Sequence, residues 1–239
     1  MREIRMLGII GGMSWLSTTE YYRLLNEGVQ KALGGSHSAR LILSSVEFQG
    51  VADAMARGDW PAVREVLVAE ARRLSSAGAQ AILIATNTMH MFAEEASEAG
   101  GVPVLHIADA VGEKIKARSL RTVGLLGTKY SMEKDFYRVR LSERFGIECL
   151  IPAEDQRERI NAIIFKELCE GRFLDASRRY VLEAAQGLVA RGAQGIVLAC
   201  TELPLIVRQE DLSVARFDTM ASHVERGVRF LLGDPPTGC

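Results

Sequence analysis

The chain contains an internal repeat, and this feature limits the folds open to it. Residues 77–88 read AGAQAILIATNT, and residues 191–202 return as RGAQGIVLACTE. Upstream of each copy lies a second matching pair, GIIGG at 8–12 and GLLGT at 124–128. Each copy reads as a helix that ends at glycine, a short apolar strand, and polar residues where the strand stops. The duplication predicts two similar halves, each with a polar strand end.

Strand and helix patterns alternate along the chain, which favours parallel βαβ units. The strand candidates are short and apolar on both faces, as strands covered by helices on two sides should be. They are Met6–Ile10, Leu41–Val46, Ala81–Ala85, Val104–Ile107, Thr122–Leu126, Ile147–Ile151, Ile196–Ala199 and Val214–Phe217. Helices are predicted from Ser17 to Gly34, from Asp59 to Ser76, from Ser131 to Phe145, over 154–170 and 174–191, and from Thr219 to Leu232, with Ser17, Asp59 and Ser131 as N-caps. The predicted fold class is α/β, with two open α/β/α halves.

The halves are expected to divide the chain near residue 100. The first half covers residues 1–100 together with the last strand and helix at 211–239, and the second covers 101–210. No low-complexity linker separates them, so the two halves should pack tightly. We expect the active site in the cleft between the halves, with Thr86 and Cys200 on opposite sides of it.

Composition and charge exclude several classes of function. The 239 residues are 48% hydrophobic and 25% charged, and Lys+Arg 29 balances Asp+Glu 30. No overall field therefore favours nucleic acid, and no basic patch carries interleaved aromatic residues. No apolar run approaches the ~18 residues of a transmembrane helix, and the run near the amino end is too short for a signal peptide. The expectation is a cytoplasmic protein without a nucleic-acid or membrane partner.

The cysteines show no metal-ligand spacing, so no metal site is predicted. Cys149 and Cys169 are expected to be buried filler, and Cys239 lies in a loose tail. Cys200 differs, because it stands where a strand ends and a helix can start. The positive potential of a helix start lowers the pKa of a thiol and favours thiolate. Glu202, two residues on, is placed to orient a substrate amine or a nearby hydroxyl.

Other strand ends also carry polar groups, and ligands bind beyond the carboxyl ends of strands in open parallel sheets. Gly11–Trp15 follows the first strand and is either a carboxylate-binding turn or only a tight turn. Thr86–His90 crowds two hydroxyls, an amide and an imidazole together, which is costly to bury without a ligand or a complete hydrogen-bond network. His90 is either a structural histidine or a proton relay. His106, with Asp109 nearby, is likewise open between structure and site.

Together these motifs resemble the aspartate/glutamate racemase superfamily of cofactor-independent amino-acid racemases, over essentially the whole chain. The resemblance is carried by GIIGGM at 8–13, NTMH at 87–90, CTE at 200–202 and FDT at 217–219. It implies two flavodoxin-like halves about a pseudo-twofold axis, no pyridoxal phosphate or other cofactor, no metal, and commonly a homodimer. It also implies that an acceptor on one face of Cα removes the α-proton and a donor on the other face returns one.

Carried over by position, Cys200 is the second catalytic thiol, and Thr86 stands where the family has its first cysteine. The implied contacts to the substrate carboxylate and amine are Gly12, Met13, Ser14, Asn87, Thr88, Thr201 and Glu202. Aspartate-selective members hold the distal carboxylate with a basic residue in the loop after the second strand. Residues 44–50 read SSVEFQG, without Arg or Lys, and leave Gln49 as an uncharged partner. Aspartate and glutamate are still the first substrates expected.

Thr86 is the main departure from the family pattern. A threonine hydroxyl is far less acidic than a thiol, so it holds no useful population of anion near neutral pH. It can still donate a proton to a carbanion, or relay one from His90 or water. The family places the second cysteine on the face that deprotonates L-amino acids. We therefore predict that Cys200 abstracts from the L-enantiomer and that the reverse direction is slow.

Two alternatives fit a site with one thiol. Superfamily relatives that decarboxylate arylmalonates, isomerise maleate or racemise hydantoins form the first. The second is an amino-acid-binding protein whose first base has been lost. The polar segment Asn87–His90 favours amino-acid binding over an apolar decarboxylase pocket.

Overall fold

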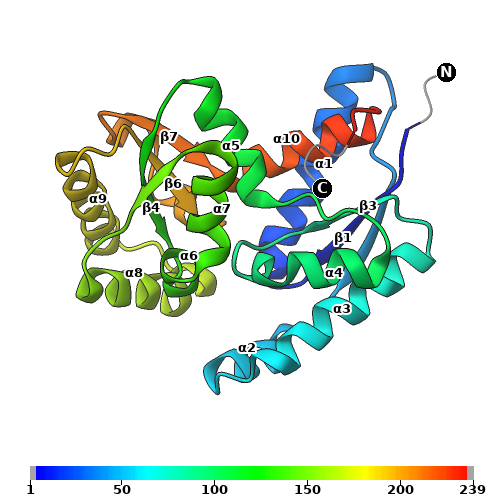
Figure 1. Ribbon diagram of the computed structural model, residues 1–239, viewed down its shortest axis with the longest axis horizontal. Helices are drawn as coiled ribbons and strands as arrows, with labels where there is room; N and C mark the ends of the chain where they lie inside the picture. Colours follow the sequence, from blue (N-terminus) through cyan, green and yellow to red (C-terminus); the bar gives the residue numbers. More distant parts are fainter. Residues whose placement is uncertain (1–3, 236–239) are drawn as a thin grey trace. The chain divides into compact units, whose positions relative to one another are not determined.

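The computed structural model of the protein (Figure 1) describes residues 4–235. These residues form two compact units: the chain up to His106 with the segment from His223 onward, and Ile107–Ser222. The first unit contains β1 (Leu7–Gly11), α1 (Trp15–Leu33), β2 (Leu41–Ser45), α2 (Phe48–Ala56), α3 (Trp60–Ser76), β3 (Ala81–Ile84), the 3₁₀ helix η1 (Thr88–Phe92) and α4 (Ala93–Gly100).

The second unit contains α5 (Ile107–Ala117), β4 (Thr122–Gly127), α6 (Lys129–Glu133), α7 (Asp135–Phe145), β5 (Glu148–Leu150), α8 (Glu154–Lys166), η2 (Leu168–Glu170), α9 (Asp175–Ala190), β6 (Gly195–Ala199), η3 (Leu203–Leu205), η4 (Gln209–Asp211) and β7 (Ala215–Asp218). The last helix, α10 (Thr219–Leu231), begins in this unit and belongs to the first unit from His223 onward. Each unit is a parallel α/β structure, which confirms the predicted fold class.

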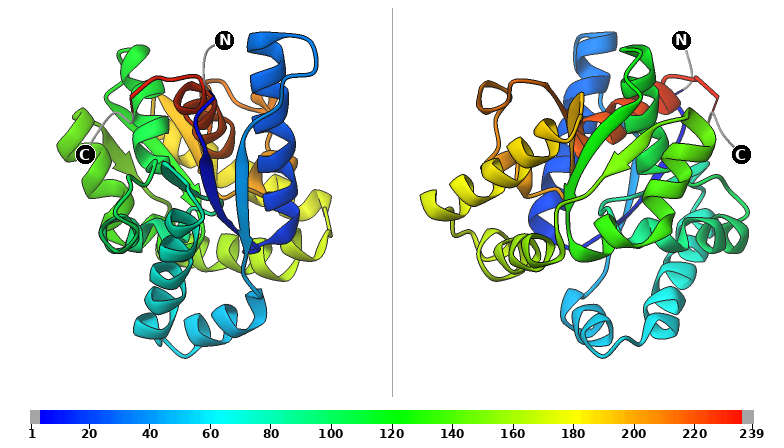
Figure 2. Two further views of the ribbon diagram at one scale, coloured as in Figure 1. Left: turned by 90° about the vertical axis from the view of Figure 1, so that its right-hand side faces the viewer. Right: turned by 60° about the vertical axis from the view of Figure 1, so that its left-hand side comes forward.

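Each sheet is parallel throughout. The first has the strand order β2-β1-β3, and α1 runs beside β1 and β2 in Figure 2. The second has the order β5-β4-β6-β7. In both sheets, the second strand of the unit lies on one side of the first strand. The third strand lies on its other side. Parallel strands whose order reverses in this way leave a place for ligands at their carboxyl ends.

The sequence repeat has the same register in both sheets. Gly8 pairs with Ile82 in the first sheet, and Gly124 pairs with Ile196 in the second. The repeated glutamines also act alike. The Gln80 side chain accepts from the N–H of Met6 at 2.8 Å, and the Gln194 side chain accepts from the N–H of Thr122 at 3.1 Å. The two copies are therefore one structural unit used twice, which makes Thr86 and Cys200 equivalent positions.

The structure corrects two predictions about strands. Val104–Ile107 is not a strand: Val104 makes one isolated bridge to Ile82, and α5 already begins at Ile107. The last strand, β7, pairs with β6 and belongs to the second sheet, so it does not return to the first half. The chain passes into the second unit at the start of α5 and leaves it only within α10. The strand β7 comes before that exit and therefore lies in the second unit.

Helix starts follow local capping, with some shifts from the prediction. Asp59 caps α3 as predicted, and Pro61 lies in the first turn. Helix α1 is capped by Ser14 and not by Ser17, and α6 is capped by Thr128 and not by Ser131. The predicted helix from Ser131 to Phe145 is divided into α6 and α7.

Helices cover both faces of the second sheet. Leu125 and Leu126 are neighbours on β4, so their side chains point to opposite faces. Leu125 packs in a cluster with Val111 of α5, and Leu126 packs in a second cluster with Ile160 of α8. Burial on both faces explains why these strands are short and apolar without alternation.

In the first unit, α10 approaches α1 closely at one point. A Cβ at Gly28 of α1 would lie 2.5 Å from a methyl carbon of Val228. Glycine is therefore needed at the place where the two helices approach.

Among residues 4–235, no helix is long and apolar enough to cross a membrane. The same residues contain no group of three or more His, Cys, Asp or Glu side chains arranged to hold a metal ion.

Candidate active site

Cys200 follows the last residue of β6, and its side chain is almost completely buried, with 5% of the residue exposed. Its Sγ donates to Oε2 of Glu202 at 3.0 Å. The hydroxyl of Thr201 donates to the same oxygen at 2.8 Å. Three consecutive residues thus bring a thiol and a hydroxyl to one carboxylate. The predicted contact between Glu202 and a nearby hydroxyl is present.

The environment of Cys200 keeps the thiol protonated. Burial raises its pKa well above the usual value, and the negative charge of Glu202 raises it further. The sequence predicted the opposite, a pKa lowered by a helix start. That prediction is wrong, because the element that follows, η3, is a single short 3₁₀ turn and a carboxylate lies directly against the sulfur.

The other described cysteines are poorly ionised. Burial raises the pKa of Cys149 and of Cys169 to about 12. Both are partly buried and pack against the core of the second unit, close to their predicted role as filler. Cys239 lies outside the described residues.

Thr86 occupies the matching position in the first unit, two residues after β3. Its N–H donates to the carbonyl of Ile84 at 2.8 Å, so the chain turns sharply there. Its own carbonyl accepts from Nδ1 of His90 at 2.8 Å. Asn87, Thr88 and His90 are buried, whereas Thr86 is partly exposed. The predicted polar strand end therefore exists, and Thr86 is its accessible member.

Behind this strand end lies a group of buried rings, here called the histidine cluster: Tyr21, His90, His106 and His223. The rings of His90 and His106 have centroids 4.8 Å apart, and those of His90 and His223 are 5.3 Å apart. Nε2 of His223 contacts the carbonyl of Leu105 at 2.5 Å, so this nitrogen must donate. The Nδ1 atom is then the acceptor for the Tyr21 hydroxyl at 3.1 Å.

Burial holds the pKa of His223 well below its usual value, with further effects from His90 and Arg226. The cluster is built from four distant points of the sequence, which is why Tyr21 and His223 were not predicted. His90 and His106 were left open between structure and site. In the structure His106 belongs to the histidine cluster. Asp109 is not part of the cluster, and its carboxylate accepts hydrogen bonds from Arg140 and Arg144.

The turn after β1 uses its polar groups internally. Gly12 has φ +91°, and a Cβ there would lie 2.2 Å from the carbonyl oxygen of Val46, so only glycine fits. The Gly12 N–H donates to the Thr18 hydroxyl at 2.8 Å, and that hydroxyl donates to the Ser14 carbonyl at 2.8 Å. Met13 is buried. The segment after β1 is therefore a tight turn with a glycine-specific backbone.

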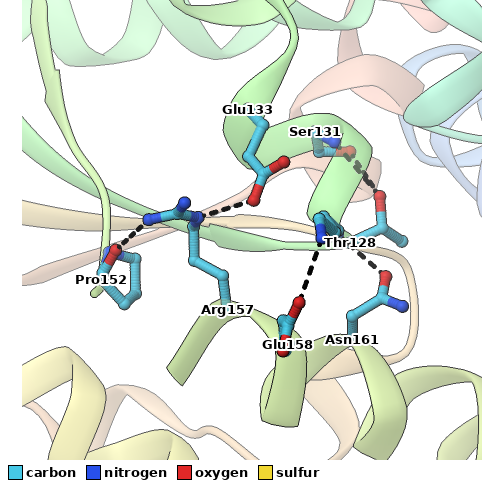
Figure 3. Close-up of polar contacts among 8 residues, drawn as sticks. Thr128, Ser131, Glu133, Pro152, Arg157, Glu158 and Asn161 are labelled. Carbon is cyan, nitrogen blue, oxygen red and sulfur yellow. Dashed lines mark hydrogen bonds and ion pairs between the residues drawn. The ribbon is translucent and has the colours of Figure 1, made fainter. Parts of the chain in front are cut away.

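The corresponding turn after β4 is tied to a neighbouring helix (Figure 3). Thr128 caps α6 and exchanges a hydrogen bond with the Ser131 hydroxyl at 3.1 Å. Arg157 of α8 donates to Glu133 at 2.8 Å and to the carbonyl of Pro152 at 2.8 Å. In addition, Asn161 accepts from the N–H of Lys129. These contacts hold α6 against α8 and give this turn a structural role.

Gln49 lies away from any loop, since α2 begins at Phe48. The carboxylate of Glu47 caps this helix by accepting from the N–H groups of Gln49 and Gly50. The Gln49 side chain donates to Asp53 at 2.8 Å on the exposed side of the helix. The predicted loop over 44–50 is therefore in part a helix start, and Gln49 has an intrahelical partner.

Comparison with known proteins identifies the family to which this chain belongs. The Asp/Glu/Hydantoin racemase family model matches residues 10–227. The chain belongs to this family, whose members are isomerases. A candidate Asp/Glu racemase from Yersinia pestis has a similar crystal structure, with a TM-score of 0.90, 45% identity and coverage of 96% of this chain and 100% of that one.

Two further relatives agree with this assignment. An aspartate racemase homologue from Pyrococcus horikoshii OT3 has a TM-score of 0.81 and 33% identity, over 98% of this chain and 100% of that one. The broad specificity amino-acid racemase RacX from Bacillus subtilis (strain 168) is 24% identical over 221 residues, which cover 90% of this chain and 93% of that protein. A small-molecule substrate follows from the family.

Proposed function

We propose that this protein is a cofactor-independent amino-acid racemase that acts first on aspartate or glutamate and prefers the L-enantiomer. In this proposal Cys200 removes the α-proton, and reprotonation comes from the Thr86 side. The observation that carries it is the hydrogen bond from the Cys200 thiol to Glu202 at 3.0 Å, at a strand end of a racemase-family chain.

The proton balance at Cys200 requires an acceptor. The raised pKa means that the resting sulfur holds a proton, which must leave before the sulfur can act as a base. Glu202 is the acceptor in contact with it. The S–H bond breaks as an O–H bond forms on Glu202. The sulfur then takes the proton from Cα, and the electron pair of that C–H bond stays on Cα next to the substrate carboxylate.

The Thr86 side returns a proton to the carbanion. Its equivalence to Cys200 in the repeat supports this role, and its hydroxyl is a donor and not a base at neutral pH. His90 donates through Nδ1 to the Thr86 carbonyl, so we assign it to positioning this strand end. Thr86 then regains its proton from water, and Glu202 releases one to water, so no net proton is consumed.

Substrate recognition is assigned to polar groups at the strand ends. We propose that Asn87, Thr88 and Thr201 contact the α-carboxylate and the amine, with the turn at Gly12, Met13 and Ser14 as a further contact. The aspartate and amino-acid racemase names of the relatives support an amino-acid substrate. Gln49 is a weaker candidate for the distal carboxylate, because its side chain already has Asp53 as a partner.

The test is an NMR screen in D₂O of L-amino acids for loss of the α-proton signal. Wild-type protein should exchange L-aspartate or L-glutamate, and Cys200→Ala should lower the exchange rate by at least about 100-fold. Cys200→Ala should still bind the same amino acid. An absence of exchange with every amino acid, together with retained binding, would favour the binding-protein alternative. Carbon dioxide release from an arylmalonate without amino-acid exchange would favour the decarboxylase alternative.

We also propose a homodimer, supported by large apolar side chains that are exposed on the first unit. Trp15 is 66% exposed and Tyr22 is 54% exposed on α1, and Leu43 is exposed on the edge strand β2. Light scattering should give twice the chain mass, and Trp15→Glu should lower it to one chain. A monomeric wild-type mass would contradict the proposal.

A further inference from the structure

The second unit contains a pocket of about 390 Å³ that the proposed reaction does not use. Its walls come from the end of α5, from β7 and from the first residues of α10, and α5 lies beside β7 in Figure 1. The lining residues are Lys114, Ala117, Arg118, Arg216, Phe217, Asp218, Ala221 and Ser222. All of them belong to one compact unit. We call this the α5–β7 pocket.

Positive side chains outnumber negative ones in the lining. Lys114, Arg118 and Arg216 are cations, and Asp218 is the one carboxylate among the lining residues. Asp218 accepts from the N–H of Ala221 at 3.0 Å and so serves as a helix cap. The negative charge of Asp218 is thus partly balanced by the N–H groups at the start of α10. The lining as a whole favours an anion.

Contacts within the wall orient two of the cations. The Arg118 guanidinium lies 5.5 Å from the centroid of the Phe217 ring, within the range of a cation–π contact. Arg216 donates through Nη1 to the carbonyl of Val207 at 2.8 Å. Arg216 has further N–H groups for a ligand, because a guanidinium carries five N–H donors in a fixed fork. Cations held in this way lose less freedom when an anion binds.

The internal repeat carries a cation at this position in only one of its two copies. Arg216 pairs with Ile196 in the second sheet, and the equivalent partner of Ile82 in the first sheet is Val104. The same register position therefore accepts an apolar residue in one copy and carries arginine in the other. The Nη1 contact with Val207 uses one end of the guanidinium, and the remaining N–H groups of Arg216 are in the pocket wall.

We propose that the α5–β7 pocket binds a small anion that carries phosphate groups. Three cations around a space of about 390 Å³ match the charge of two linked phosphates better than that of a single carboxylate. The phosphates alone, or a nucleoside diphosphate, supply this chemistry. The Phe217 ring is buried and already faces Arg118, so it offers no free face for a base to stack on.

The test is titration calorimetry of the full-length protein with inorganic pyrophosphate, at constant ionic strength because such binding is sensitive to salt. Lys114→Gln and Arg118→Gln should each raise the Kd about tenfold. Arg118→Lys should retain most of the affinity, which separates loss of charge from loss of folding. A parallel titration with ADP distinguishes the sources: an equal Kd means that the phosphates alone are recognised, and a lower Kd means that the nucleoside also binds.

Two further variants serve as controls. Lys116 lies on the same helix, is exposed and does not line the pocket, so Lys116→Gln should leave the Kd within about twofold. Asp218→Asn keeps a capping side chain and removes the negative charge, so it should lower the Kd. The proposal is overturned if pyrophosphate does not bind, if Lys116→Gln weakens binding as much as Lys114→Gln, or if Asp218→Asn weakens it.

Discussion

At the scale of single residues, the contact between Cys200 and Glu202 has two opposing effects on the chemistry. The carboxylate raises the pKa of the thiol, which lowers the resting population of thiolate. In the proposed reaction the same carboxylate, which already accepts the hydrogen bond of the thiol, also accepts its proton. Glu202 therefore disfavours the thiolate and would also accept the proton, so its removal should affect thiol reactivity and turnover in opposite directions.

Glu202→Gln should separate these effects. Without the negative charge, the pKa of Cys200 falls, so alkylation of this thiol by iodoacetamide should begin at lower pH. Without the proton acceptor, α-proton exchange should slow about 100-fold. Mass spectrometry of the alkylated peptide measures the first effect, and NMR in D₂O measures the second.

Glu210→Gln is the matched control for this experiment, because Glu210 is exposed on η4. It should change neither the pH dependence of alkylation nor the exchange rate. If Glu202→Gln raises the alkylation pKa, or leaves exchange at the wild-type rate, the proposed role of Glu202 is wrong.

At the scale of elements, helix packing decides where glycine is required. Gly28 of α1 faces Val228 of α10, whereas a Cβ at Gly187 of α9 would have no atom within 4 Å. The two positions are both inside helices, and alanine is intrinsically preferred to glycine there. Tertiary packing reverses that preference at Gly28 and leaves it unopposed at Gly187.

Gly28→Ala should therefore destabilise the protein by about 1–3 kcal/mol through overpacking. Gly187→Ala should stabilise it by about 0.5–1 kcal/mol. Urea unfolding followed by circular dichroism measures both changes. Val228→Ala in the Gly28→Ala background should restore part of the loss. Equal effects of the two glycine substitutions would show that the α1–α10 contact does not set the outcome.

The elements also show how far the sequence determines the fold. The repeated strands were predictable because they are buried on both faces, and their register followed from the repeat. Val104–Ile107 was misread as a strand, since apolar residues at a crossing between units look like a strand until the partner is known. The start of α2 at Phe48 was missed, because its cap, Glu47, is not among the usual capping residues.

Site residues divide in the same way. Thr86, Cys200 and Glu202 were identifiable because each lies within three residues of the end of a recognisable strand. The raised pKa of Cys200 was not predictable, because it depends on burial and on a carboxylate two residues away that folds back onto the sulfur. Tyr21 and His223 join His90 only through the tertiary structure.

At the scale of the whole molecule, the buried histidine cluster links stability to pH. The pKa of His223 in the folded protein lies well below its value in an unfolded chain. At a pH between these two values, the unfolded chain binds a proton that the folded protein does not. The contribution of neutral His223 to stability is therefore fully present above about pH 6.5. It is lost progressively as the pH falls below this value.

The neutral state of His223 should make the free energy of unfolding decline below about pH 6.5 by at most about 1.4 kcal/mol per pH unit. Urea titrations between pH 7.5 and 5 measure this slope. His223→Gln should reduce it, whereas His37→Gln, at an exposed position, should leave it unchanged. A slope that is the same in wild type and His223→Gln would contradict this account.

The central claim is that the two sides of the reaction are chemically unequal, with a thiol at Cys200 and a hydroxyl at Thr86. The most direct measurement is the initial rate of α-proton exchange in D₂O for the L- and D-enantiomers of the same amino acid, at equal saturation. The account predicts faster exchange from the L-enantiomer, with the exchange abolished in Cys200→Ala. Equal initial rates from both enantiomers would contradict it.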